Sequence, residues 1–371
     1  MMRKRFLAIV LVAFPLGAAH PADSTDAKLG SAGMLMLKGL PACMEEDFSS
    51  AYERCLPARA DPEATAVTRH DALLARAKVM IYLRRSDEAL QELESASTAL
   101  PTSVGAPHLA ARLAIGNFKD LNDDGSLIAA KTYIARAVAL APGDADVRAT
   151  EAFIIQSMGT PEAAIAAYNR ALALNPEQPF ALQQRAFLHV ARGDIDKALK
   201  DYGKAVAVSP DDVALRHARA ELLLELGQPE AALQDLNVAI EQDKYAFLVY
   251  VMRAGVHQRL GNAAAALEDL DSLIYGPKGG MPFATGGDQL AGFFMQRALV
   301  HSDLGRTSEA AHDMLNAARL AGKQKLLRLQ VYLRQNGLTV PVDGTASDTL
   351  KDAIETCFRQ EQCRRGLGQP T

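Results

Sequence analysis

Residues 145–178 read ADVRATEAFIIQSMGTPEAAIAAYNRALALNPEQ, and residues 179–212 read PFALQQRAFLHVARGDIDKALKDYGKAVAVSPDD. The two stretches carry small residues at the same positions, and the pattern continues along the chain. The repeated positions are Ala152, Ala186, Ala220 and Ala254; Gly159, Gly193, Gly227 and Gly261; Ala164, Ala198, Ala232 and Ala266; and Ala171, Ala205 and Ala239. Alanine lets two helices cross closely, glycine ends a helix where φ is positive, and Pro176 and Pro210 stop the next one. Each period of 34 residues therefore predicts a pair of helices.

The repeat extends beyond these two blocks. The four clear blocks begin near Ala145, Pro179, Val213 and Phe247. A fifth follows an insertion and has matching residues at Ala298, Gly305, Ala310, Met314 and Ala317. Looser matches upstream bring the expected number to about seven between His70 and Ala321. Each pair buries its apolar face only against its neighbours, so we predict an all-α solenoid with a concave groove.

The period and the small-residue positions resemble the tetratricopeptide repeat. The tryptophan that is usual in that pattern is missing, because the chain has no Trp. Its position is held by Arg148, Leu182, Arg216 and Tyr250. The resemblance implies a helix-turn-helix solenoid over residues 70–321. It also implies a scaffold that binds proteins or peptides, rather than an enzyme, and it implies no cofactor.

In this family the first helix of each repeat lines the concave side. Carried onto this chain, the lining positions predict a partner-binding groove that includes Phe153, Gln156, Phe180, Gln183, Phe187, His217, Glu221, Glu225, Gln258 and Arg259. Such a set would hold an extended or helical segment through apolar anchors and a polar rim. The alternative is that Phe153 and Phe187 pack against the adjacent second helix. Relatives that bind chaperone tails use a Lys and Asn clamp here, and this chain lacks the Lys.

Two charged positions also repeat. Arginine recurs on first helices at Arg185, Arg219, Arg253 and Arg297, and aspartate on second helices at Asp201, Asp235, Asp269 and Asp313. A charged ladder could grip a ligand. However, a feature repeated unchanged in every unit is more typical of architecture than of selectivity. We therefore predict Arg–Asp pairs that hold adjacent helices in register.

The first residues have the composition of a secretory signal peptide. A basic start at Arg3, Lys4 and Arg5 precedes an apolar run from Phe6 to Phe14 and small residues up to Ala19. The run is shorter than the roughly 20 residues that span a bilayer. We expect a signal peptide at 1–19 and an exported, periplasmic protein with no membrane span.

The four cysteines flank the solenoid in two close pairs. Cys43 and Cys55 lie in an N-terminal segment, residues 20–69, and Cys357 and Cys363 lie near the end of the chain. In an oxidising compartment this arrangement predicts two short disulfides, although four cysteines allow three pairings. Zinc is the alternative, but the spacings match no common zinc motif and no histidine is near.

Other candidate sites are weaker. Residues 120–125 read DLNDDG, like the first half of a calcium loop, but Lys131 stands where a bidentate Glu belongs. An Asx-rich turn explains the same residues.

The Gly-rich insertion at 275–287 lacks the Lys-Ser or Lys-Thr of a phosphate loop. His189, His257 and His301 share one repeat position, which separates them too widely for one metal. With 40 basic and 44 acidic residues and no basic stripe, a nucleic-acid partner is not expected. We predict neither a catalytic nor a metal site.

Residues 322–371 depart from the repeat and form a predicted small helical module. It resembles the peptidoglycan-binding module of wall enzymes at Leu329, Gln330, Leu333, Gly337, Asp343, Gly344, Ala353 and Ile354. It departs from that family at Ser347, Leu350 and Cys357. The sequence thus predicts a protein- or peptide-binding scaffold at the cell envelope. The alternative is a peptidoglycan-binding protein in which the solenoid is a spacer.

Overall fold

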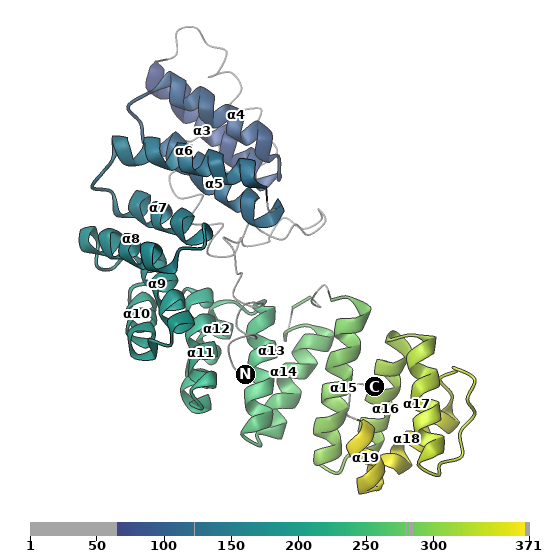
Figure 1. Ribbon diagram of the computed structural model, residues 1–371. Coiled ribbons are helices and arrows are strands. Elements are labelled where there is room, and N and C mark those ends of the chain that lie inside the picture. Colours follow the sequence, from purple (N-terminus) through teal and green to yellow (C-terminus); the bar gives the residue numbers. More distant parts are fainter. Residues whose placement is uncertain (1–64, 122, 279, 282, 284, 368–371) are drawn as a thin grey trace. The chain divides into compact units, whose positions relative to one another are not determined.

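The computed structural model describes residues 65–121, 123–278, 280–281, 283 and 285–367. In these ranges the chain forms seventeen helices and no strand (Figure 1). The signal peptide expected at 1–19 and the Cys43 and Cys55 pair lie outside the described residues. Among the helices described, none is both long enough and apolar enough to cross a membrane.

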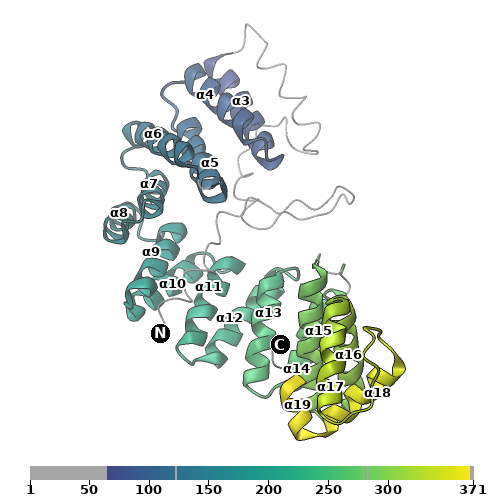
Figure 2. The same ribbon diagram turned by 45° about the vertical axis from the view of Figure 1, so that its right-hand side comes forward.

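The first compact unit ends at Pro210. Its helices are α3 (Ala66–Tyr82), α4 (Ser86–Ala99), α5 (Gly105–Leu121), α6 (Asp124–Leu140), α7 (Ala145–Ser157), α8 (Pro161–Leu174), α9 (Pro179–Arg192) and α10 (Ile195–Val208). They pack as four consecutive pairs, and the first helices of neighbouring pairs also contact one another from α3 to α9 (Figure 2). Helices α5, α7 and α9 therefore form one continuous face.

The second compact unit begins at Asp211. Its helices are α11 (Val213–Glu225), α12 (Pro229–Gln242), α13 (Phe247–Arg259), α14 (Ala263–Tyr275), α15 (Gly287–Asp303), α16 (Thr307–Leu320), α17 (Lys323–Gln335), α18 (Asp348–Arg359) and α19 (Glu361–Leu367). Helices α11 to α16 form three more pairs. The predicted all-α solenoid of about seven helix pairs is confirmed.

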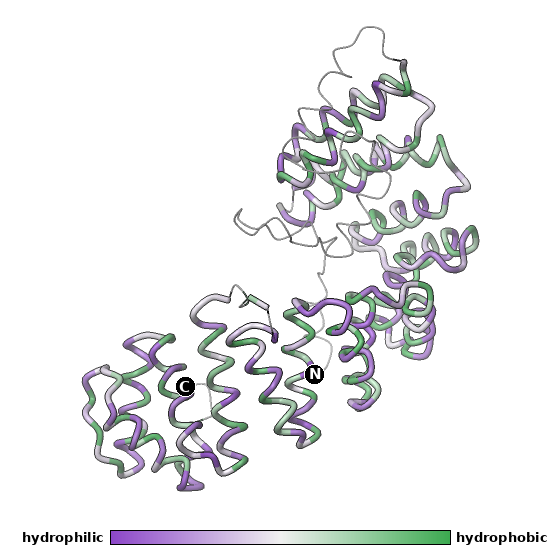
Figure 3. Tube along the Cα trace, turned by 180° about the vertical axis from the view of Figure 1, so that it is seen from behind, coloured by the Kyte–Doolittle hydropathy of each residue, from purple (hydrophilic) through white to green (hydrophobic). Residues whose placement is uncertain are grey.

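The repeated small residues explain why each period folds into a pair. Apolar residues recur along the helices between stretches of polar ones (Figure 3). When apolar residues recur every three to four positions, a helix has one apolar side that it can bury. Among the repeated alanines, Ala152, Ala164, Ala186 and Ala198 are fully buried where helices cross. Five of the seven first helices are followed by a glycine with a φ between 70° and 80°, namely Gly159, Gly193, Gly227, Gly261 and Gly305. This left-handed conformation favours glycine because a Cβ atom would strain it.

The four predicted Arg–Asp pairs all form, each within one helix pair. The shortest N–O distances are 2.7 Å for Arg185–Asp201, 2.5 Å for Arg219–Asp235, 2.6 Å for Arg253–Asp269 and 2.7 Å for Arg297–Asp313. Arg76 and Glu92 form a fifth pair with the same separation of 16 residues, at 2.8 Å. The prediction that the repeated arginines and aspartates form ion pairs between adjacent helices is confirmed.

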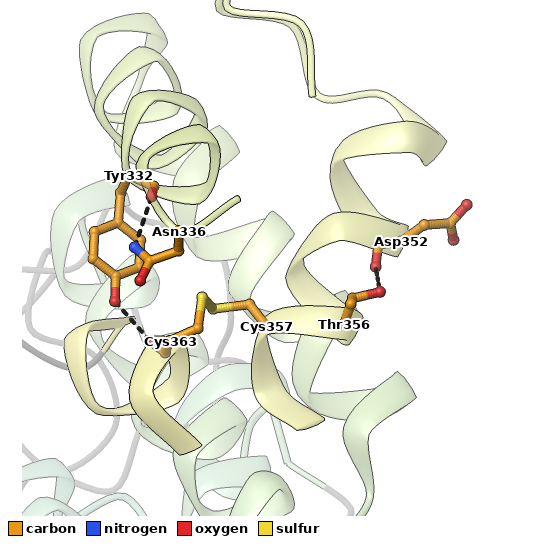
Figure 4. Close-up of a disulfide and its surroundings, with 6 residues drawn as sticks. All are labelled: Tyr332, Asn336, Asp352, Thr356, Cys357 and Cys363. Carbon is orange, nitrogen blue, oxygen red and sulfur yellow. Dashed lines mark hydrogen bonds between the residues drawn. A yellow bond between two sulfur atoms is a disulfide. The ribbon is translucent and has the colours of Figure 1, made fainter. Parts of the chain in front are cut away.

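The C-terminal helices extend the core of the last helix pair. Met314 and Leu315 of α16, Leu333 of α17 and Ile354 of α18 belong to one cluster of buried side chains. The Cys357–Cys363 disulfide links α18 to α19, and the Tyr332 hydroxyl donates to the Cys363 carbonyl at 2.7 Å (Figure 4). The small helical module thus packs as the end of the second unit.

Candidate functional site

Five of the ten predicted groove residues lie in the first unit, on helices that contact each other. Phe153 and Gln156 are on α7, and Phe180, Gln183 and Phe187 are on α9. We refer to these five residues and Lys119 of α5 as the α5–α9 face. Helix α9 begins at Pro179, which fits the first turn because proline has no N–H to leave unbonded there. Its side chains Ala181, Leu182, Ala186 and Leu188 are buried, whereas Phe180, Gln183 and Phe187 stay partly exposed.

Phe153 lies beneath this face rather than on its surface. Its side chain is only 2% exposed. The Lys119 ammonium nitrogen sits 3.9 Å from the centre of the Phe153 ring, and the Phe180 ring meets it edge-on at 5.4 Å. Phe153 therefore supports the two side chains that cover it.

Gln156 is held by hydrogen bonds to two neighbouring helices. Its Nε2 donates to Oε1 of Gln184 on α9 at 3.3 Å. Its Oε1 accepts from the hydroxyl of Tyr168 on α8 at 2.8 Å, and Tyr168 is fully buried. Burial also raises the pKa of Tyr168. Because both ends of the Gln156 amide are used, this side chain fixes the spacing of α7, α8 and α9.

Lys119 is the residue of this face that the sequence prediction missed. Burial lowers the pKa of its ammonium group to about 8. No carboxylate within the described ranges forms an ion pair with it. A signal was present in the sequence, because Lys119 precedes Phe153 by one period and so occupies the same repeat position.

Two other basic side chains of α5 lie on the same side of that helix. His108, Arg112 and Lys119 are spaced by four and seven residues, which places them on one helical face. The His108 Nε2 lies 2.8 Å from the Thr150 hydroxyl on α7. Burial, with a smaller contribution from Arg112, lowers the pKa of His108 to about 4. Burial also lowers the pKa of Arg112, and Asp146 opposes that shift.

The other five predicted groove residues lie in the second unit. His217, Glu221 and Glu225 follow one another at four-residue intervals on α11 and share one side of it. Burial and then the Glu225 carboxylate raise the pKa of Glu221, and burial lowers the pKa of His217. Gln258 and Arg259 are exposed in the last turn of α13.

The remaining candidates have structural roles. Asp123 caps α6 by accepting from the backbone N–H groups of Gly125 and Ser126, as expected of an Asx turn. The three repeated histidines lie in three different helices, α9, α13 and α15, and burial lowers the pKa of each. In the insertion, Phe283 packs against Phe247 with ring centres 5.3 Å apart. In the part of the chain that the structure describes, no His, Cys, Asp or Glu side chains are grouped to bind a metal.

Comparisons with known proteins agree on the repeat. Family models described as tetratricopeptide repeat match residues 152–178 and 189–246. No curated protein sequence matches this chain significantly.

Solved structures of repeat proteins are similar at low sequence identity. A thermophilic TPR protein of Thermus thermophilus is 23% identical over 48% of this chain and 91% of its own, with a TM-score of 0.41. PilW, described as a type IV pilus biogenesis factor, is 17% identical over 55% of this chain and 91% of its own, with a TM-score of 0.46. YrrB, described as a TPR protein with an unusual peptide-binding site, is 17% identical over 53% of this chain and 96% of its own, with a TM-score of 0.35. Together, the family matches and the seven helix pairs identify the fold as a tetratricopeptide-repeat solenoid.

Proposed function

We propose that this chain is a scaffold that binds segments of other proteins along its first helices. The observation that carries the proposal is the partial exposure of Phe180 and Phe187 on α9. These aromatic side chains remain partly exposed, whereas Ala181, Leu182, Ala186 and Leu188 of the same helix are buried. Partly exposed aromatic side chains with amides beside them are common anchors for protein partners.

The proposal includes export to the periplasm and a role without catalysis. The Cys357–Cys363 disulfide supports an oxidising compartment. The four-part organisation at 1–19, 20–69, 70–321 and 322–371 belongs to the same proposal. Sequencing the N-terminus of the protein secreted to the periplasm tests it, and the expected first residue is His20.

Site-specific crosslinking tests the binding proposal. A photoreactive amino acid replaces Gln183 on the α5–α9 face in one variant and Lys200, exposed on α10, in the control. Irradiation of living cells should crosslink a discrete partner from position 183 and none from position 200. Equal crosslinking from both positions, or none from position 183, contradicts the proposal.

Peptidoglycan binding by residues 322–371 is the second candidate, and the arrangement around Gln330 favours it. Gln330 is fully buried, donates to Asp343 Oδ1 at 2.9 Å and accepts from the Gly344 N–H at 2.8 Å. Three of the residues that carry the resemblance, Gln330, Asp343 and Gly344, are therefore joined by hydrogen bonds around one turn. Sedimentation of the intact chain with purified peptidoglycan tests this role. The protein should pellet with the polymer and be released by soluble wall fragments; a chain that stays in the supernatant contradicts it.

A further inference from the structure

The α5–α9 face combines a partly buried cation, Lys119, with aromatic side chains, and this pairing points to the chemistry of a ligand. We propose that it binds an extended peptide segment with a carboxylate side chain close to an aromatic one. The carboxylate pairs with Lys119, and the aromatic side chain packs against Phe180 and Phe187. The proposal rests on the scaffold function and names the chemistry of the partner.

Lys119 is the first reason. Its ammonium group has lost part of its hydration, as its lowered pKa indicates, and within the described residues it has gained only the Phe153 ring. A cation over an aromatic face recovers part of the cost of burial. A carboxylate from a ligand would recover more, because a charge-assisted hydrogen bond is stronger where water is partly excluded.

The shape of the face supports an aromatic side chain next to the carboxylate. Lys119 and Phe180 both contact the Phe153 ring, so they are neighbours on the face. In an extended peptide, side chains two residues apart point the same way and are separated by about 7 Å. One such pair of side chains can reach both groups.

Charge complementarity selects an acidic segment over a basic one. Arg112 lies on the same side of α5 but interacts with the Asp146 carboxylate, so Lys119 supplies the positive charge of this face. The chain as a whole is mildly acidic, so this cationic face differs from the average surface. Complementary charge both speeds association and rejects partners of the wrong sign.

Fluorescence anisotropy on the full chain tests the proposal. The probe is a labelled peptide Gly-Ser-Glu-Ser-Phe-Ser-Gly, and its matched versions carry Gln or Lys in place of Glu, or Ala in place of Phe. We expect the Glu-Phe peptide to bind at least tenfold more tightly than any of the others. Its affinity should fall as salt is added.

Variants of the protein test whether Lys119 is the residue that pairs with the carboxylate of the peptide. Lys119→Gln should weaken binding about tenfold, and Lys119→Arg should largely restore it. Lys200→Gln changes the net charge equally on α10 and should leave binding unchanged. With the Gln peptide, Lys119→Gln should cause no further loss, because the two changes remove the same interaction. Unchanged circular dichroism shows that the variants fold.

Other results overturn the proposal. If Lys119→Gln binds the probe as well as the original chain, or Lys200→Gln weakens it equally, Lys119 does not receive the carboxylate. If the Lys peptide binds best, a basic segment occupies the face. If Lys119→Gln instead abolishes self-association in analytical ultracentrifugation, the occupant is a second copy. If the proposal of an acidic peptide ligand is wrong but the proposal of a scaffold is right, position 183 still crosslinks to a protein partner.

Discussion

At the scale of single residues, burial of His108 links stability to pH. The pKa of His108 is about 4 in the folded chain and near 6.5 when unfolded. Between these values the unfolded chain binds more protons, so the free energy of unfolding falls as the pH drops below about 6.5. The shift corresponds to a loss of about 3 kcal/mol by pH 4.

Replacing His108 tests this link. His108→Gln keeps a polar group for Thr150 but cannot titrate, and the charged neighbours Arg112, Asp144 and Asp146 stay in place. Urea unfolding at pH 7 and at pH 4.5 should show a smaller acid-induced loss for the variant than for the original chain. An equal loss in both proteins would assign the pH dependence to other groups.

The repeat pattern predicted which residues lie on first helices but not how their side chains cover one another. The sequence predicts that Phe153 lines the groove, and the residue does lie on a first helix, α7. It is buried because Lys119, one period earlier, lies on its ring. Contacts between helices depend on side-chain length and charge in the neighbouring repeat, and small-residue periodicity carries no information about these.

At the scale of helices, the Arg–Asp pairs predict an asymmetric effect of mutation. In the Arg185–Asp201 pair, the arginine side chain is 21% exposed and the aspartate 5%. Arg185→Met leaves a buried carboxylate without its counter-charge, which costs about 3 kcal/mol or more. Asp201→Asn leaves an arginine that reaches water and still donates a hydrogen bond to Asn169. We therefore expect this variant to lose about 1 kcal/mol of its free energy of unfolding.

Chemical unfolding of the two variants measures this difference. The exposed pair Arg365–Glu361 supplies the control, and Arg365→Met should cost less than about 0.5 kcal/mol. If Asp201→Asn lowers the free energy of unfolding as much as Arg185→Met, burial of the carboxylate does not determine the loss of stability.

The sequence predicts the four Arg–Asp pairs because both residues recur with the period. Arg76–Glu92 was missed because glutamate replaces aspartate in the most divergent repeat.

At the scale of the whole molecule, the sequence predicted the helix pairs well because each pair is specified locally. Small residues mark the crossing points, and glycine and proline mark the ends, so no long-range information is needed. The end of the second unit was harder to predict. Residues 322–371 looked separate because the period stops there, yet their apolar side chains pack on α16. Loss of periodicity marks a change of pattern, and a shared core is visible only in three dimensions.

This shared core makes the C-terminal helices a cap of the second unit, and truncation tests that role. A chain ending at Gly322 lacks α17 to α19 and uncovers Met314 and Leu315, which are almost fully buried in the complete unit. Losing the burial of these two side chains costs about 3 kcal/mol or more, and exposed terminal repeats favour aggregation. We therefore expect this chain to unfold at a lower temperature and to scatter light at concentrations where the control does not. The control ends at Leu367 and keeps all three helices. If both chains unfold at the same temperature and stay monomeric, residues 322–371 are a separable module. The truncated chain would then also serve for the peptidoglycan assay.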